Sequence, residues 1–247
     1  MLLFFIFSDK TISTMNKFFL IVLFSFTINP LIAQLSLSGN AVASVQFRDA
    51  NGRLLSTGEN SIKGSPYVFE QFGLGKVTMS NGLEAVDSNL NFSFFDHQLY
   101  FLKDKGLYFV NQPFNAFSIT SKDAENNTTE KLFANGYPSF DQNTAKTFYE
   151  VVVKTNNLQL LKYSKAFVKE STPYGSAPIK EYSIDHTYYI YNNSSKQLSL
   201  VGSSTSAKNL KKALPTYAAS IDNQIDQLHL NLKKESDLQI LFQKISN

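Results

Sequence analysis

The fold class is decided by an apolar stretch in three segments, Leu90-Asn91-Phe92-Ser93-Phe94, Leu99-Tyr100-Phe101-Leu102 and Leu107-Tyr108-Phe109-Val110, the last two separated by Lys103-Asp104-Lys105-Gly106. The first segment alternates large apolar and small polar residues, which is typical of a strand with one buried face. The other two segments flank a four-residue polar turn, as the strands of a hairpin do. Strands joined by so short a loop are antiparallel neighbours, so this stretch predicts an antiparallel sheet.

The same hairpin pattern recurs on both sides of this stretch. Upstream, Asn81-Gly82 follows Val77-Thr78-Met79 and supplies the positive φ angles of a tight turn. Downstream, two further hairpins are expected from strand pairs, Phe148–Val153 with Leu158–Tyr163 and Tyr188–Tyr191 with Gln197–Val201. We therefore expect an antiparallel β meander, curved into an open sheet or half-barrel. A short strand is also expected over Ala41–Phe47, and loops are expected over residues 121–130 and 170–180.

The chain changes character at Thr205. Ser206 can cap a helix over Ala207–Leu214, and Pro215 suits the first turn of a second helix. A third helix is expected to open at Ser236, with Asp237 in its first turn and Lys244 in its last. Two apolar stripes at helical spacing run along this tail: Leu214, Tyr217, Ile221, Ile225, Leu228 and Leu232, then Leu238, Leu241, Phe242 and Ile245. The sequence predicts an α+β protein whose C-terminal helices pack on the sheet, with a helical docking arm as the alternative.

The N-terminal region has the organisation of a secretory signal peptide. Lys17 precedes an apolar segment, Phe18–Ile28, and Asn29-Pro30 breaks that segment shortly before Ala33. We expect cleavage after Ala33. The alternative is a retained membrane anchor, but an unbroken span needs about 20 apolar residues. Residues 1–14 either precede a true start at Met15 or belong to one longer signal.

The expected organisation is therefore a leader over residues 1–33, a β-rich domain over residues 34–204 and a helical tail over residues 205–247. After cleavage of the leader we expect no membrane-spanning segment.

Composition excludes several classes of protein. The absence of cysteine rules out a disulfide scaffold and thiolate metal sites. The net charge of +3, from 23 basic and 20 acidic residues, is too small to favour a nucleic-acid partner. The 22 Phe and 12 Tyr offer enough apolar surface for a folded core.

The sequence offers few candidates for catalytic or metal-binding residues. The chain has three histidines, His97, His186 and His229, and the first two follow aspartates in Asp96-His97 and Asp185-His186. Adjacent residues on a strand point to opposite faces, so we interpret each Asp as ending a turn and each His as beginning a strand, rather than as metal ligands. No Gly-x-Ser-x-Gly pattern marks a nucleophile. We accordingly predict no catalytic, cofactor-binding or metal-binding residue.

Aromatic side chains are the most concentrated feature of the sequence. Nine of them fall between Phe92 and Phe117. Such a group is typical of a sheet core. The alternative is a cavity for an apolar ligand, for which the lining residues would be Phe92, Phe94, Phe101 and Phe109.

Two groups of residues carry a resemblance. Gly64-Ser65-Pro66-Tyr67 followed by Gly75-Lys76-Val77 forms one group, and Leu210-Lys211-Lys212 with Leu232–Leu238 forms the other. Together with the hairpin pattern, they resemble a broad group of secreted or envelope proteins of Gram-negative bacteria with no assigned activity. The resemblance implies export, a β-rich body and a helical C-terminus, and it carries over no functional residue.

These observations predict an exported, non-enzymatic protein that is periplasmic, extracellular or envelope-associated and has a binding or structural role. Its partner would be a protein or an apolar ligand, and no cofactor is expected. One alternative is a carrier or sensor of an apolar ligand, such as a lipid, held between the sheet and the helices. The other is a hydrolase with an unmarked active site.

Overall fold

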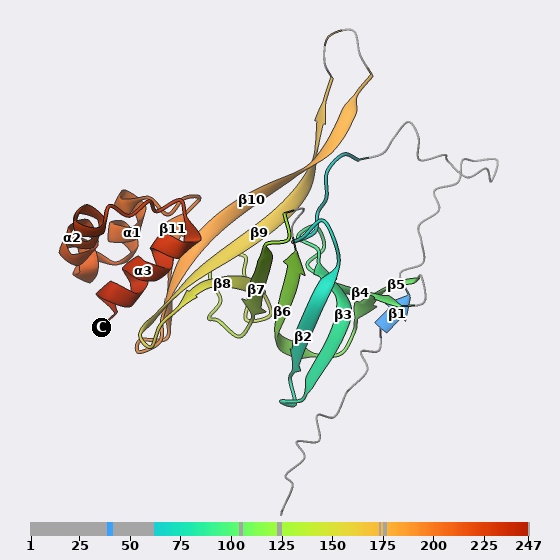
Figure 1. Cartoon of the computed structure of the whole chain (residues 1–247), viewed down its shortest axis with the longest axis horizontal. Helices are drawn as coiled ribbons and strands as arrows, with labels where there is room; N and C mark the ends of the chain where they lie inside the picture. Colours follow the sequence, from blue (N-terminus) through green and yellow to red (C-terminus); the bar gives the residue numbers. More distant parts are fainter. Residues whose placement is uncertain are drawn as a thin grey trace, which may run out of the picture. The chain divides into compact units, whose positions relative to one another are not determined.

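The computed structural model describes residues 39–41, 62–103, 106–122, 125–172, 174 and 177–246, all within one compact unit, Ala33–Asn247. Eleven described strands form one open antiparallel sheet, and three α-helices follow it (Figure 1). This confirms the α+β class, the antiparallel open sheet and the helical C-terminus. The predicted leader lies outside the described residues.

The strands are β1 (Gly39–Ala41), β2 (Gly73–Met79), β3 (Glu84–Phe92), β4 (Leu99–Lys103), β5 (Gly106–Val110), β6 (Phe114–Lys122), β7 (Thr128–Ala134), β8 (Tyr149–Lys154), β9 (Leu158–Ser171), β10 (Ile179–Asn192) and β11 (Gln197–Gly202). The helices are α1 (Ala207–Ala213), the short 3-10 helix η1 (Pro215–Tyr217), α2 (Ala218–Leu228) and α3 (Glu235–Ile245). Within the described part of the chain, no helix has the length and apolarity needed to cross a bilayer.

The sheet is two meanders joined at β2. Its strand order is β1-β5-β4-β3-β2-β6-β7-β8-β9-β10-β11. After β5 the chain returns to the free side of β2, where Val77 pairs with Phe117 of β6 while also pairing with Ala85 of β3. The expected antiparallel meander is present in two stretches, β5-β4-β3-β2 and β6 to β11, and the sequence did not predict that β6 would pair with β2. The outer side of β5 is paired with β1.

The predicted hairpins are all present, and several strands are longer than expected. In the β2–β3 turn, Gly82 has a φ of 84°, as the Asn-Gly signal requires. The loops expected over residues 121–130 and 170–180 are shorter, because β6, β7, β9 and β10 extend into those ranges. Of the strand expected over Ala41–Phe47, only Ala41 lies among the described residues, and it ends β1.

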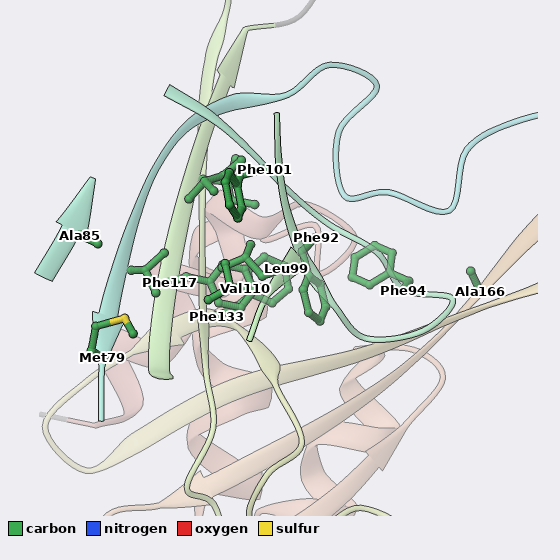
Figure 2. Packing of buried hydrophobic residues seen from close by; sticks show 13 residues of the cluster. Met79, Ala85, Phe92, Phe94, Leu99, Phe101, Val110, Phe117, Phe133 and Ala166 are labelled. Atoms are coloured by element: carbon green, nitrogen blue, oxygen red, sulfur yellow. The ribbon is translucent and has the colours of Figure 1, made fainter. Parts of the chain in front are cut away.

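An aromatic cluster fills the face of the sheet formed by β2 to β7. Figure 2 shows Phe92 close to Phe94, Leu99, Val110 and Phe133. The ring of Phe92 lies 5.0 Å from that of Phe117 and 5.3 Å from that of Phe133 (centroid distances). We call this group the aromatic cluster; its buried members are Val77, Met79, Ala85, Leu90, Phe92, Phe94, Leu99, Phe101, Val110, Phe117, Ile119, Phe133 and Ala166. Among the residues that the structure describes, no helix residue belongs to it.

The helices cover a second, mainly aliphatic cluster at the β8–β11 end of the sheet (Figure 1). We call this group the helix-covered cluster; its buried members are Val152, Val153, Leu158, Leu160, Ile190, Val201, Leu210, Leu214, Ile221, Leu238, Leu241, Phe242 and Ile245. The expectation that the helical tail packs on the sheet is borne out by these contacts. The Ser206 hydroxyl caps α1 by accepting a hydrogen bond from the Asn209 amide at 3.3 Å, as predicted.

Two details of the predicted helices differ. Lys234, not Ser236, occupies the N-cap of α3, and the Ser236 hydroxyl instead donates to Asp237. Asp237 accepts a hydrogen bond from the Asn231 amide at 2.8 Å, which fixes the turn before the helix. Leu228, predicted to lie on the buried stripe of α2, is exposed because the stripe turns outward at the end of that helix.

Candidate functional site: a charged cleft between β7 and β8

Strands β7 and β8 separate soon after they meet. They share only two pairs, Phe133 with Glu150 and Ala134 with Tyr149. On its other side β7 is paired with β6 along its full length. A cleft of about 410 Å³ lies where the two strands part. Its lining comes from β2, β3, β6, β7, β8 and α3: Lys76, Thr78, Glu84, Ala116, Phe117, Ser118, Glu130, Lys131, Leu132, Glu150, Val151, Val152, Glu235 and Gln239.

The separation leaves part of the β7 backbone facing the cleft. The Asn135 amide donates to the Asn115 carbonyl at 2.9 Å, in register with the β6–β7 ladder. In an antiparallel ladder the backbone groups of alternate residues point to opposite sides. The odd-numbered residues of β7 therefore bond to β6, whereas Glu130 and Leu132 direct their N–H and C=O groups toward β8. In the described part of the chain, no β8 residue pairs with either of them.

A chain of ion pairs joins the walls of the cleft. Lys131 on β7 contacts one carboxylate oxygen of Glu150 on β8 at 2.6 Å, and Lys162 on β9 contacts the other at 3.0 Å. Lys162 also lies 3.4 Å from Glu235, the first residue of α3. Side chains from three strands and a helix are thus connected by alternating charges.

Glu150 is the centre of this chain and is only 3% exposed. Burial by itself would raise the pKa of the Glu150 carboxyl, but the ammonium groups of Lys162 and Lys131 outweigh it and hold that pKa below its ordinary value. Burial likewise opposes the charge on Lys162, while Glu150 and Glu235 raise its pKa. Glu150 and Lys162 are therefore both charged near neutral pH.

Next to the series of ion pairs lies a polar pair, Ser164 on β9 and His186 on β10. Ser164 is cross-strand partner of His186, and its hydroxyl lies 2.8 Å from Nδ1 of that ring. Ser164 is buried. Burial, followed by the charge of Lys162, lowers the pKa of His186. A buried hydroxyl of this kind has little access to a substrate, so the pair contributes to sheet packing.

The histidines are not brought together. His97 lies in the turn between β3 and β4 with a φ of 57°, and its Nε2 is 3.2 Å from the Tyr163 hydroxyl. His186 lies in the middle of β10, and His229 ends α2 in a left-handed conformation. The interpretation that each His begins a strand is therefore wrong. Tertiary pairing has extended β10 through Asp185-His186. Across the described ranges, no three His, Cys, Asp or Glu side chains are grouped to hold a metal.

The four residues predicted as an apolar lining lie away from the cleft. Phe92, Phe94 and Phe101 are buried in the aromatic cluster, packed against neighbouring side chains. Phe109 is half-buried on β5, paired with Tyr100 and with Asn40 of β1. This packing favours the core interpretation for the first three, and the apolar-ligand hypothesis stays a prediction.

Sequence reasoning missed the residues of the charged cleft, although a signal was present. Glu150 stands alone within the apolar run Phe148–Val153, and Lys162 stands within Leu158–Tyr163. Isolated charges inside buried strands are costly unless they are paired, so each charge predicts a partner. The pairing itself depends on the three-dimensional register. Comparison of the chain with protein-family models, curated protein sequences and solved structures gives no match. Its function is therefore argued from this site.

Proposed function

We propose that the protein is a non-enzymatic binding protein that acts outside the cytoplasm, in the periplasm or at the cell envelope, and that its ligand occupies the cleft between β7 and β8. The observation that carries this proposal is the chain Lys131–Glu150–Lys162–Glu235, which fixes charged groups on three strands and a helix around an open cleft. The cleft volume falls within the range of small-ligand sites, about 300 to 1,000 Å³. A site held this rigidly is suited to recognition, because little ordering is needed when the ligand binds.

The electrostatics of the cleft favour binding over acid–base chemistry. A general base works best with a pKa near the working pH. The pKa of Glu150 is instead lowered, away from neutral pH, and both of its carboxylate oxygens contact ammonium groups. Its carboxylate is therefore committed to holding Lys131 and Lys162 in place.

Export is supported by the pattern of the leader. A cation, an apolar segment and a Pro-containing break occur in the order expected of a secretory signal. The resemblance to secreted proteins of Gram-negative bacteria points the same way.

The proposal is tested by comparing two preparations of the exported protein by hydrogen–deuterium exchange. One is isolated from its host under native conditions. The other is unfolded in guanidinium chloride, dialysed and refolded, which removes a bound ligand. We expect slower exchange in the native preparation at residues 130–132 and 150–152. The material released on unfolding should restore the slow exchange when it is added back.

A matched pair of variants locates the effect. Leu132→Glu places a charge in the cleft, whereas Leu200→Glu changes an exposed leucine on β11. Only Leu132→Glu should abolish the difference between preparations. Identical exchange in both wild-type preparations would contradict the proposal. Slower exchange confined to residues 92–110, with a lipid released on unfolding, would also contradict it and favour the apolar carrier.

A further inference from the structure

We infer that the occupant of the cleft is an extended polypeptide segment that adds a strand antiparallel to β7 and places a basic side chain beside Glu130. This inference rests on the proposed function, since it names the class of ligand for the same cleft. It follows from the backbone of β7, from the side chains along its free edge and from the charge of the cleft.

The backbone argument concerns the direction of hydrogen-bonding groups. Glu130 and Leu132 turn their N–H and C=O groups away from β6, into the space that β8 leaves as it diverges. An open strand edge of this kind is a template for an added strand, and main-chain hydrogen bonds then supply affinity. All pairs between the named strands of this sheet are antiparallel, and we assign the added segment the same direction relative to β7.

The side-chain argument gives the added segment a pattern. Glu130 and Leu132 are two residues apart and so share a face of β7. Both are exposed, Leu132 by 39%. In an antiparallel neighbour, the residue beside Leu132 comes two positions before the residue beside Glu130. The favoured segment therefore reads apolar, any residue, basic, because opposite charges and apolar pairs stabilise directly opposed positions.

The charge of the cleft selects the basic residue. Two lysines and four glutamates line it, which gives a formal charge of −2. Both lysines are already ion-paired, Lys76 with Glu84 at 2.7 Å and Lys131 with Glu150 at 2.6 Å. Among the described residues Glu130 has no ion-pair partner, so its carboxylate is available to a ligand.

A second copy of this chain fits the edge poorly. Antiparallel pairing of β7 with β7 of another copy would bring two negatively charged clefts together. Like charges on opposed strands are destabilising. A foreign segment with a Lys or Arg side chain removes this repulsion and adds an attraction in its place.

The test uses synthetic ten-residue peptides and fluorescence anisotropy. A polar, extended peptide with a central Val-Thr-Lys sequence is compared with the same peptide carrying Val-Thr-Glu. Two further peptides carry N-methyl groups at alternate positions, one in each of the two possible registers, so that one of them lacks the N–H groups that would face the β7 edge. We expect the basic peptide to bind at least about tenfold more tightly than the acidic one. One of the two N-methyl registers should lose binding.

Variants of exposed residues give the matched control. Glu130→Lys should reverse the preference toward the acidic peptide, whereas Glu181→Lys, an equal change of charge on β10, should leave it unaltered. Equal affinity for both peptides, or binding insensitive to N-methylation in either register, would overturn the inference. So would a wild-type dimer in mass photometry that Glu130→Lys strengthens, since this would make a second copy the occupant.

The two proposals fail differently. Slow exchange at the cleft in the native preparation, combined with no peptide binding, would refute strand addition and leave the binding function standing. The absence of slow exchange at the cleft would refute the binding function itself.

Discussion

The two halves of the sheet cover the same face by different means. Between β2 and β7 the face is filled by the aromatic cluster, in which five of the 13 buried residues are Phe. Between β8 and β11 the face carries Leu, Val and Ile and is covered by three helices, and the helix-covered cluster holds one buried Phe. The aromatic side chains bury much of their large surface against one another, whereas the aliphatic face is buried against an added layer of helices.

Strand β9 crosses the boundary between the two clusters. Alternate residues of a strand share a face, and along β9 these are Leu158, Leu160, Lys162, Ser164 and Ala166. The first two belong to the helix-covered cluster and the last to the aromatic cluster. Lys162 and Ser164 lie between them, within the chain of charged and polar groups that ends at the cleft. These charged and polar groups, Lys131, Glu150, Lys162, Ser164 and His186, form what we call the polar layer. The polar layer separates the two apolar clusters, and β9 contributes residues to both clusters.

The largest effect is expected from Phe92→Ala in the aromatic cluster. Phe92 is 1% exposed and contacts the rings of Phe94, Phe117 and Phe133. Its truncation should lower the free energy of unfolding by about 3–5 kcal/mol, through lost burial and the cavity left behind. Urea denaturation followed by circular dichroism measures this. Phe95→Ala, at a half-exposed position beside Tyr182, should cost less, about 0.5–1.5 kcal/mol.

The same variant also tests whether the halves are independent. Hydrogen exchange should accelerate in β3 and β6 while α3 keeps its protection. Equally faster exchange in α3 would show that the two clusters unfold as one unit, which would contradict the independence of the two halves.

The next effect is expected from Leu241→Ala in the helix-covered cluster. Leu241 is fully buried on α3, so its truncation should cost about 2–5 kcal/mol. The loss should be seen as faster exchange in α1, α2 and α3 with little change in β2 to β6. Ile240→Ala, on the exposed face of the same helix, is the matched control. Faster exchange in β2 to β6, of the same size as in the helices, would argue against separate clusters.

A smaller effect is expected from Glu150→Gln in the polar layer. The change leaves Lys131 and Lys162 without their shared carboxylate and should cost about 1.5–3 kcal/mol, the range for hydrogen bonds to charged groups. Glu84→Gln breaks the exposed Lys76–Glu84 pair and should cost at most about 1 kcal/mol. Equal losses in the two variants would show that burial does not strengthen the Glu150 pairs.

The pH dependence of the same variant follows from the pKa of Glu150. That pKa is lower in the folded chain than its ordinary value of 4.5. The ion pairs therefore add stability above pH 4.5, and this contribution is lost as the pH falls through the folded pKa. Thermal melts between pH 7 and pH 3 should show a smaller acid-induced loss for Glu150→Gln than for wild type. Parallel curves would contradict this assignment.

The sequence predicted the elements whose signals are local. Asn81-Gly82 predicts its hairpin because the tight turn requires positive φ angles, which these residues adopt readily. Ser206 predicts the start of α1 because the hydroxyl of an N-cap residue bonds to the backbone of the helix that follows it. The sequence did not predict that β6 would pair with β2, because β3, β4 and β5 lie between these strands in the sequence and no local pattern specifies the contact. The pairing of β9 and β10 with each other also extended both strands beyond the segments that the sequence predicted.

The cleft escaped prediction for the same reason. Lys131, Glu150, Lys162 and Glu235 are spread over more than a hundred residues of sequence, and only the register of β8 with β9 and the docking of α3 bring them together. The isolated Glu150 could have been recognised as a buried charge in need of partners. No local pattern states that β7 and β8 diverge beside it.

The smallest expected effect concerns two half-buried histidines, one in each region of the comparison. His97 stacks on Tyr163 beside the aromatic cluster, with ring centroids 5.2 Å apart, and His186 lies in the polar layer. Burial lowers the pKa of both. For His97, Asp96 opposes the shift and Lys165 adds to it. For His186, Lys162 and Lys131 add to the shift while Glu150 and Asp185 oppose it.

A lowered folded pKa means that the unfolded chain binds protons first. Stability should therefore be full above pH 6.5, the ordinary pKa of histidine, and should decline as the pH falls below it until the folded pKa values are passed. Urea midpoints at pH 7.5 and 5.5 measure the decline. Asparagine adopts the left-handed backbone conformation of this turn readily, so His97→Asn should remove the part of the stability decline that is due to His97. His186→Gln should remove the other, whereas Gln98→Ala, an uncharged exposed neighbour, should remove none. If only His186→Gln flattened the curve, acid sensitivity would belong to the polar layer alone, and the aromatic half would respond to acid only through it.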